Sequence, residues 1–171
     1  TQTSPTWQPG SLAVTLTVAC AQPVEFTLKI RLPWWVQGDP AIAVNGRPEP
    51  GPFAPGSMHS IRRSWTDETV SLTLPKGLTS APLPDDPTMV AFMDGPVVLA
   101  GLCDDERTLR GDKDHPETIL TPHNLYRKPE YRTHRRPEYR FHNQLHYVRF
   151  IPLHEVRDER YTVYFPVQGA D

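Results

Sequence analysis

The chain has 171 residues, of which 37% are hydrophobic and 22% charged, and its formal net charge at pH 7 is -2. A chain of this length forms one substantial domain or two small ones and buries enough surface to fold without a metal or a disulfide. Basic and acidic residues are mixed along most of the chain and no apolar run could cross a bilayer, so we expect a soluble protein with neither nucleic acid nor membrane as a partner.

The cysteine and proline content limits the fold classes that this chain can adopt. Cys20 and Cys103 are the only cysteines, which excludes a cysteine-rich scaffold or a four-cysteine zinc site and leaves their pairing open. The 20 prolines would interrupt helices often, and the stretches between them mostly alternate with period two. The opening residues, TQTSPTW, have no signal-peptide pattern; the cellular location stays open, with the cytoplasm favoured.

Apolar and polar residues alternate in the first third of the chain. This alternation predicts three strands, over residues 12–18, 24–32 and 42–44. Pro33 removes a backbone donor and restrains the residue before it, so the second strand should end there and a loop over 34–40 should follow. The third strand reaches Asn45-Gly46, a dipeptide that suits the positive φ angles of a tight hairpin turn.

The next part of the chain continues the pattern. Residues 47–57 have loop composition, and further strands are predicted over 58–65, over 70–74 and on either side of a bend at Asp94, Gly95 and Pro96. About seven short strands between residues 12 and 102 are typical of an antiparallel sandwich. We therefore predict an all-β fold, an antiparallel β-sandwich of Greek-key or jelly-roll type over residues 1–102.

Residues 103–143 are dense in charge, His, Arg and Tyr, which predicts a charged loop or arm rather than core. Alternation returns over 145–156 and 161–167, which predicts a C-terminal β-hairpin with its turn near Asp158 and Glu159. We expect residues 144–171 to complete the sandwich or to form a small second sheet.

The candidate catalytic groups do not form a credible constellation. A glycosidase needs two carboxylates that face each other across a bond, and neighbours on one loop do not; this excludes Asp85 with Asp86, and Asp104, Asp105 and Glu106. On a strand, His142 and His146 lie too far apart to bind one metal, His154 lies further along the chain, and no Asp or Glu lies at a matching position. The acidic neighbours of Cys103 disfavour a thiolate. We expect no catalytic residue, no metal site and no cofactor in this chain.

Three tryptophans are the candidate binding residues. Trp34 and Trp35 lie together in the loop after Pro33, and Trp7 lies near the start of the chain. Exposed indole rings could stack on sugars, and they could equally cap the end of a sandwich or contact an adjoining domain. Packing and domain contact are the favoured hypothesis.

An ordered series of motifs resembles one family. FTLKIRLPWW, AIAVNGRP, IRRSW, VSLTLP and VAFMDGPVVLAG are similar to the region that follows the catalytic barrel in the β-L-arabinofuranosidase family, glycoside hydrolase family 127. The matching positions are Phe26, Leu28, Ile30, Arg31, Leu32, Pro33, Trp35, Val44, Asn45, Gly46, Arg63, Trp65, Leu72, Leu74, Pro75, Ala91, Gly95 and Pro96. The link Thr66 to Thr69 departs from the family in lacking a glycine.

The resemblance implies a non-catalytic role. Family members carry their zinc-bound cysteine nucleophile in an (α/α)6 barrel, and neither Cys20 nor Cys103 lies in a matching motif. The chain then resembles an accessory domain that braces an N-terminal catalytic barrel of the same polypeptide, with Trp35 packed and Trp34 more exposed. Two alternatives stay open: a carbohydrate-binding module that stacks sugars on tryptophan, and a homodimerisation domain that uses the arm from Asn124 to Arg140.

Overall fold

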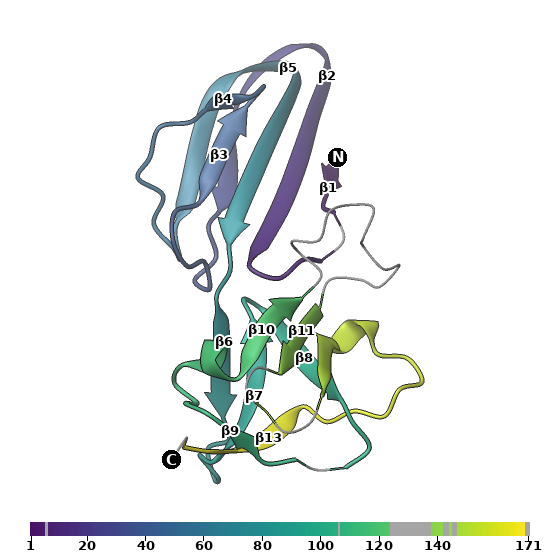
Figure 1. Ribbon diagram of the computed structural model, residues 1–171. Coiled ribbons are helices and arrows are strands. Elements are labelled where there is room, and N and C mark those ends of the chain that lie inside the picture. Colours follow the sequence, from purple (N-terminus) through teal and green to yellow (C-terminus); the bar gives the residue numbers. More distant parts are fainter. Residues whose placement is uncertain (6, 106, 124–137, 142–143, 145–146, 170–171) are drawn as a thin grey trace. The chain divides into compact units, whose positions relative to one another are not determined.

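The structure, a computed structural model, describes residues 1–5, 7–105, 107–123, 138–141, 144 and 147–169. Its regular structure is almost entirely strand, which confirms the all-β prediction. The chain divides into two compact units, Thr1–Gly77 and Leu78–Asp171, here called the N-terminal and C-terminal units (Figure 1). Among the described residues, no helix has the length and apolar character needed to span a bilayer.

The N-terminal unit is one antiparallel sheet that folds over on itself. Its strand order is β1 (Gln2–Thr3), β2 (Ser11–Arg31), β5 (Met58–Pro75), β3 (Ala41–Val44) and β4 (Arg47–Pro48). β2 and β5 pair along their whole length, with a register shift between Ala19 and Val24. Both strands bend over at that shift, so their two halves face each other as two layers (Figure 1). This bent sheet is the predicted antiparallel sandwich.

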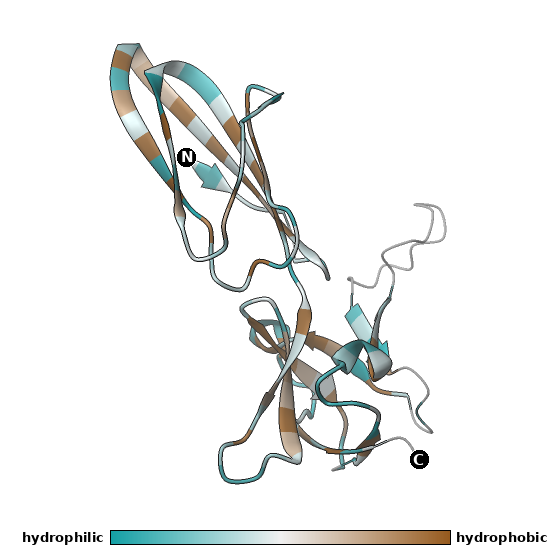
Figure 2. Ribbon diagram, turned by 90° about the vertical axis from the view of Figure 1, so that its left-hand side faces the viewer, coloured by the Kyte–Doolittle hydropathy of each residue, from teal (hydrophilic) through white to brown (hydrophobic). Residues whose placement is uncertain are grey.

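The space between the layers holds an apolar core. The alternation predicted for β2 and β5 is visible as bands of opposite hydropathy along both strands (Figure 2). The buried members of this core are Ile30, Leu32, Val36, Ile42, Val44, Ile61, Trp65, Val70, Leu72 and Leu74. Trp65 is fully buried, stacks on Phe26 at 5.4 Å between ring centroids, and donates its indole N–H to the Phe26 carbonyl at 3.0 Å.

Two predicted strand breaks in this unit are absent. We expected separate strands over 12–18 and 24–32 and over 58–65 and 70–74, whereas β2 and β5 each run through. Pro23 lies within the register shift, where the ladder is interrupted and a missing backbone donor is tolerated. On β5, the Glu68 carboxylate accepts the backbone N–H of Thr66 at 2.7 Å, which supports the bend locally.

The predicted hairpin turn is confirmed. Asn45 and Gly46 have φ angles of 49° and 75° and join β3 to β4. The side-chain oxygen of Asn45 also accepts the N–H of Thr69 at 2.8 Å, and its own N–H donates to the Thr69 carbonyl at the same distance. The turn therefore also fixes the end of β3 against β5.

The C-terminal unit contains an eight-stranded sheet around a cluster of aromatic rings. Its order is β10 (Leu120–His123), β11 (Glu138–Phe141), β12 (Arg149–Pro152), β8 (Val97–Leu102), β7 (Met89–Asp94), β13 (Tyr164–Gln168) and β9 (Leu109–Arg110), with β6 (Leu78–Pro82) on β7. Two short 3-10 helices, Pro116–Thr118 and Leu153–Glu155, connect strands. Phe92, Phe141, Phe150 and Phe165 meet at centroid distances of 5.2 to 6.3 Å.

The predicted C-terminal hairpin is wrong. β12 pairs with β11 and β8, and β13 pairs with β7 and β9, so the two strands do not pair with each other. The reason is that β7 and β8 form an apolar hairpin, in which Phe92 and Leu99 are fully buried, and each strand needs a partner along its outer edge. The predicted bend between them, at Asp94 to Pro96, is confirmed.

The boundary between the units also differs from the expected one. We placed the end of the sandwich at residue 102, whereas β6, β7 and β8 lie in the C-terminal unit. The charged segment 103–143 contributes to the core within its described part, because Leu109, Ile119, Leu120 and Tyr139 are buried. Charged residues outnumber these apolar residues in the segment, so its composition did not indicate that the apolar ones are buried. Most of the proposed arm, residues 124–137, lies outside the described residues.

Candidate functional sites

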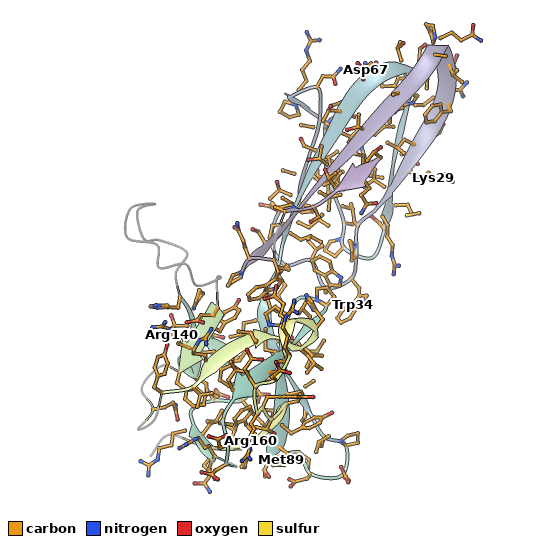
Figure 3. The ribbon with its side chains drawn as sticks, turned by 90° about the vertical axis from the view of Figure 1, so that its right-hand side faces the viewer. Lys29, Trp34, Asp67, Met89, Arg140 and Arg160 are labelled. Atoms are coloured by element: carbon orange, nitrogen blue, oxygen red, sulfur yellow. The ribbon has the colours of Figure 1, made fainter. Side chains whose placement is uncertain are left out.

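A tight turn presents one tryptophan to solvent and packs the other. The turn follows β2 and is closed by a hydrogen bond from the Val36 N–H to the Pro33 carbonyl at 3.3 Å. Trp34, at its outer corner, is 72% exposed and stands away from the N-terminal unit (Figure 3). Trp35 is partly buried against the core, and Val36 is buried and bridges to Lys76. Trp34 is therefore the more exposed of the pair, as its position predicted.

Trp7 lies against a buried lysine rather than in the open. The ammonium of Lys76 lies 5.2 Å from the centroid of the Trp7 ring and donates to the Gln8 carbonyl at 2.9 Å. Lys76 is only 8% exposed, so ring and carbonyl replace part of the water that the charge has lost.

A small hollow opens beside Lys76. Trp7, Gln8, Ser11 and Lys76 are among the residues that line it, and its volume is about 40 Å³. That volume has room for about three water molecules, which is less than a sugar ring occupies. Sequence reasoning missed Lys76, because a lone lysine after a strand normally marks a solvated end.

The acidic loops hold solvated carboxylates. Asp86 accepts the backbone N–H of Thr88 at 3.0 Å and its hydroxyl at 2.6 Å, and these hydrogen bonds hold the pKa of Asp86 below its ordinary value. Asp85, Asp104 and Asp105 are exposed. Within the described part of the chain, no group of three or more His, Cys, Asp or Glu residues is placed to hold a metal ion.

The remaining candidates are scattered. His154 is exposed on the short helix Leu153–Glu155, while Glu106, His142 and His146 lie outside the described residues. Cys103 donates weakly to the Gly101 carbonyl, and burial raises the pKa of its thiol, against the opposing charge of Arg107. Cys20 and Cys103 are free and lie in different units. Neither has the surroundings of a zinc-bound thiolate.

A buried ion cluster in the C-terminal unit escaped the sequence analysis. The side chain of Glu138 is 1% exposed, and its two oxygens accept from Arg140 Nη2 at 2.7 Å and from Arg149 Nε at 2.6 Å. The Arg140 guanidinium also lies 4.8 Å from the centroid of the Tyr147 ring. The two arginines come from neighbouring strands, β11 and β12, so the cluster ties these strands together. Glu138 lies in a charged segment, and its neighbours in the sequence do not indicate that its side chain is buried.

Comparison with known proteins identifies the N-terminal unit. A family model described as "Beta-L-arabinofuranosidase, GH127 middle domain" matches residues 2–76. Residues 2–76 are a GH127 middle domain. The limits of this match nearly coincide with the N-terminal unit, Thr1–Gly77, so Trp34, Trp35, Trp7 and Lys76 all belong to the GH127 middle domain. A search of curated proteins finds no match.

Solved structures share the fold over nearly the whole chain. A protein titled "Glycoside hydrolase" matches 97% of this chain at 16% identity and a TM-score of 0.58, and the match covers 32% of that protein. A GH127 β-L-arabinofuranosidase from Geobacillus stearothermophilus T6 matches 98% at 20% identity and a TM-score of 0.57, over 30% of its length. A GH127 β-arabinofuranosidase matches 98% at 18% identity and a TM-score of 0.55, over 31% of its length. The chain thus spans about a third of each.

Proposed function

We propose that this chain is a non-catalytic accessory part of a glycoside hydrolase and that it braces an N-terminal catalytic barrel of the same polypeptide. The observation that carries the proposal is the match of residues 2–76 to the GH127 middle domain. The fold agrees over nearly the whole chain with enzymes about three times its length, which leaves most of each enzyme for other domains.

The chemistry of the described residues supports the same proposal. Hydrolysis of a glycosidic bond requires an acid and a second carboxylate or other nucleophile on opposite sides of that bond. The buried carboxylate of Glu138 is held by two arginines. The exposed carboxylates of Asp85 and Asp86, and those of Asp104 and Asp105, are sequence neighbours on loops. The thiol of Cys103 has a raised pKa, which is the wrong direction for a nucleophile at neutral pH.

Trp34 is the side chain best suited to a domain contact. It combines a large apolar ring with 72% exposure, on a turn whose next residues, Trp35 and Val36, are held by the core. Burial of such a ring against a second domain would remove apolar surface from water without any rearrangement of the turn.

The same exposure favours one alternative, a carbohydrate-binding role in which Trp34 stacks on a sugar ring. A fluorescence titration of the 171-residue chain with L-arabinose-containing oligosaccharides separates the two. The accessory role predicts a flat response and no hydrolysis of an aryl β-L-arabinofuranoside. Saturable quenching that Trp34→Ala removes and Trp35→Phe retains would support sugar binding, and turnover by the isolated chain would contradict a non-catalytic role.

A further inference from the structure

The C-terminal unit places an exposed aromatic ring beside the two arginines that hold Glu138. Phe141 donates its N–H to the Val148 carbonyl at 3.4 Å, so the pairing of β11 with β12 continues before Arg149. Side chains alternate along this stretch, because Val148 is 2% exposed and Tyr147 is 58% exposed. Tyr147 and Arg149 therefore point to the same face of the sheet, with their Cα atoms roughly 7 Å apart.

Arg149 has hydrogen-bond donors to spare. Its Nε donates to Glu138 Oε2 at 2.6 Å, while Arg140 occupies Oε1 through Nε at 2.8 Å and Nη2 at 2.7 Å. Among the described residues, Arg149 donates no hydrogen bond from its terminal nitrogens, Nη1 and Nη2. The Arg149 side chain is 34% exposed, so a ligand can reach these nitrogens from solvent. Together they form a planar fork that matches the two oxygens of a carboxylate.

The charges of this cluster favour a ligand with one negative charge. Two guanidinium groups surround one carboxylate, which leaves a surplus of one positive charge. The pKa of Glu159 is lowered mainly by the hydrogen bond from the Arg157 N–H at 2.9 Å and to a smaller extent by the charge of Arg149, so Glu159 competes only weakly for that charge. A carboxylate would balance the cluster, whereas a phosphate group, with nearly two negative charges at pH 7, would exceed it.

The Tyr147 ring adds a flat apolar surface to the fork. The guanidinium carbon of Arg140 lies 4.8 Å from the centroid of the ring, so Arg140 covers one face and fixes the orientation of the ring. Because Tyr147 is 58% exposed, the other face is open to solvent. An open aromatic face of this kind can stack against the C–H groups of a sugar ring.

We propose that Arg149 and Tyr147 bind a uronic acid residue, which is a sugar ring that carries a carboxylate. The carboxylate accepts hydrogen bonds from the two terminal nitrogens of Arg149, and the sugar ring lies against the open face of Tyr147. Arg140 supports the tyrosine ring from the other face, and Glu138 holds both guanidinium groups in place.

This site is independent of the accessory role, because it uses only the surface of the C-terminal unit. It also differs from the stacking of a sugar on Trp34. The uronate site lies outside the GH127 middle domain of residues 2–76, and it requires a negative charge on the sugar.

Titration calorimetry of the 171-residue chain with trigalacturonate tests the site. We expect saturable binding with a Kd of about 1 mM and no binding of a neutral galactose trisaccharide, which lacks the carboxylates. Tyr147→Ala removes the stacking surface at an exposed position, so the variant should fold and its Kd should rise about tenfold. Tyr147→Phe should keep the affinity. Tyr164→Ala, a matched control on β13 with 42% exposure, should leave the Kd unchanged.

The fork is tested by Arg149→Lys, which keeps the charge and replaces the fork by a single ammonium. Its Kd should also rise about tenfold, while Arg140 still pairs with Glu138. Arg110→Lys makes the same change at an exposed position on β9, at the other end of the strand order, and should have no effect. Near-ultraviolet circular dichroism of each variant checks that it is folded.

Three results would overturn the proposal. They are no saturable binding up to about 20 mM trigalacturonate, equal binding of the neutral trisaccharide, and a Kd that Tyr147→Ala and Arg149→Lys both leave unchanged. Tighter binding of inorganic phosphate than of trigalacturonate would assign the arginines to a phosphate ligand and would also overturn it.

Discussion

The two units of this chain bury different kinds of side chain. The core of the N-terminal unit consists of aliphatic side chains around one tryptophan, Trp65, between the layers of a bent sheet. The C-terminal unit packs phenylalanine rings and also encloses a carboxylate, Glu138, between two arginines. An apolar core tolerates small adjustments, whereas a buried charge requires its partners in place. The stability of the second unit should therefore depend on a few polar contacts.

The chain offers separate spectroscopic probes for this comparison. All four tryptophans lie in residues 1–77, and all six tyrosines lie in residues 103–171. Tryptophan fluorescence therefore follows unfolding of the N-terminal unit, and tyrosine contributes to the near-ultraviolet circular dichroism only through the C-terminal unit.

The largest effect is expected in the apolar core. Trp65→Ala should lower the free energy of unfolding of the N-terminal unit by about 3–5 kcal/mol, because it opens a cavity and leaves the Phe26 carbonyl without its donor. Urea denaturation followed by tryptophan fluorescence measures the loss. Trp34→Ala, at an exposed position, should change it by less than about 0.5 kcal/mol. Equal losses at the two positions would contradict the assigned core.

The buried charge should matter next. Glu138→Gln should destabilise the C-terminal unit by about 2 kcal/mol, less than for a fully enclosed pair because the Arg140 and Arg149 side chains are 20% and 34% exposed. Denaturation followed by tyrosine circular dichroism gives the value. Glu25→Gln removes an exposed pair with Arg62 and should cost less than about 0.5 kcal/mol. A loss from Glu138→Gln no larger than this control would show that the cluster is not a stabilising element.

A backbone test compares two glycines. Gly46 has a φ of 75° and Gly169 has no positive φ, and a Cβ atom at either position would meet no other group. Gly46→Ala should therefore cost about 1 kcal/mol through backbone conformation alone, and Gly169→Ala should be neutral. Thermal unfolding of both variants decides the point, and a neutral Gly46→Ala would mean that the turn relaxes to another type.

The smallest effect concerns the pKa of Asp86. Thr88→Ala removes the hydroxyl that helps to lower this pKa, which should rise toward its ordinary value in an NMR titration. Since the folded-state pKa is the lower one, the contribution of Asp86 to stability is present above the unfolded-state pKa and is lost as the pH falls through the folded-state value. Thr88→Ser should keep the low pKa. An unchanged pKa in Thr88→Ala would leave the backbone hydrogen bonds as its cause.

Local patterns predicted the N-terminal unit well. Alternation identified the apolar faces of β2 and β5, and Asn45-Gly46 predicted the turn between β3 and β4. Continuity through Pro23 could not be predicted, because a proline is tolerated there only where the ladder is already shifted.

The C-terminal unit shows where local patterns fail. The pairing of β12 with β8 and of β13 with β7 depends on which edges the rest of the sheet leaves open, and alternation within a strand carries no such information. Glu138 and Lys76 were missed for a related reason, since their burial follows from distant partners rather than from their neighbours in sequence.

The proposal that this chain braces a catalytic domain can be tested by thermal unfolding of that domain in trans. The catalytic domain of the parent polypeptide, expressed without residues 1–171, would be heated alone and with increasing amounts of this chain. The account predicts a saturable rise in its unfolding midpoint at a one-to-one ratio, reduced by Trp34→Ala. An unchanged midpoint with both partners folded would contradict it.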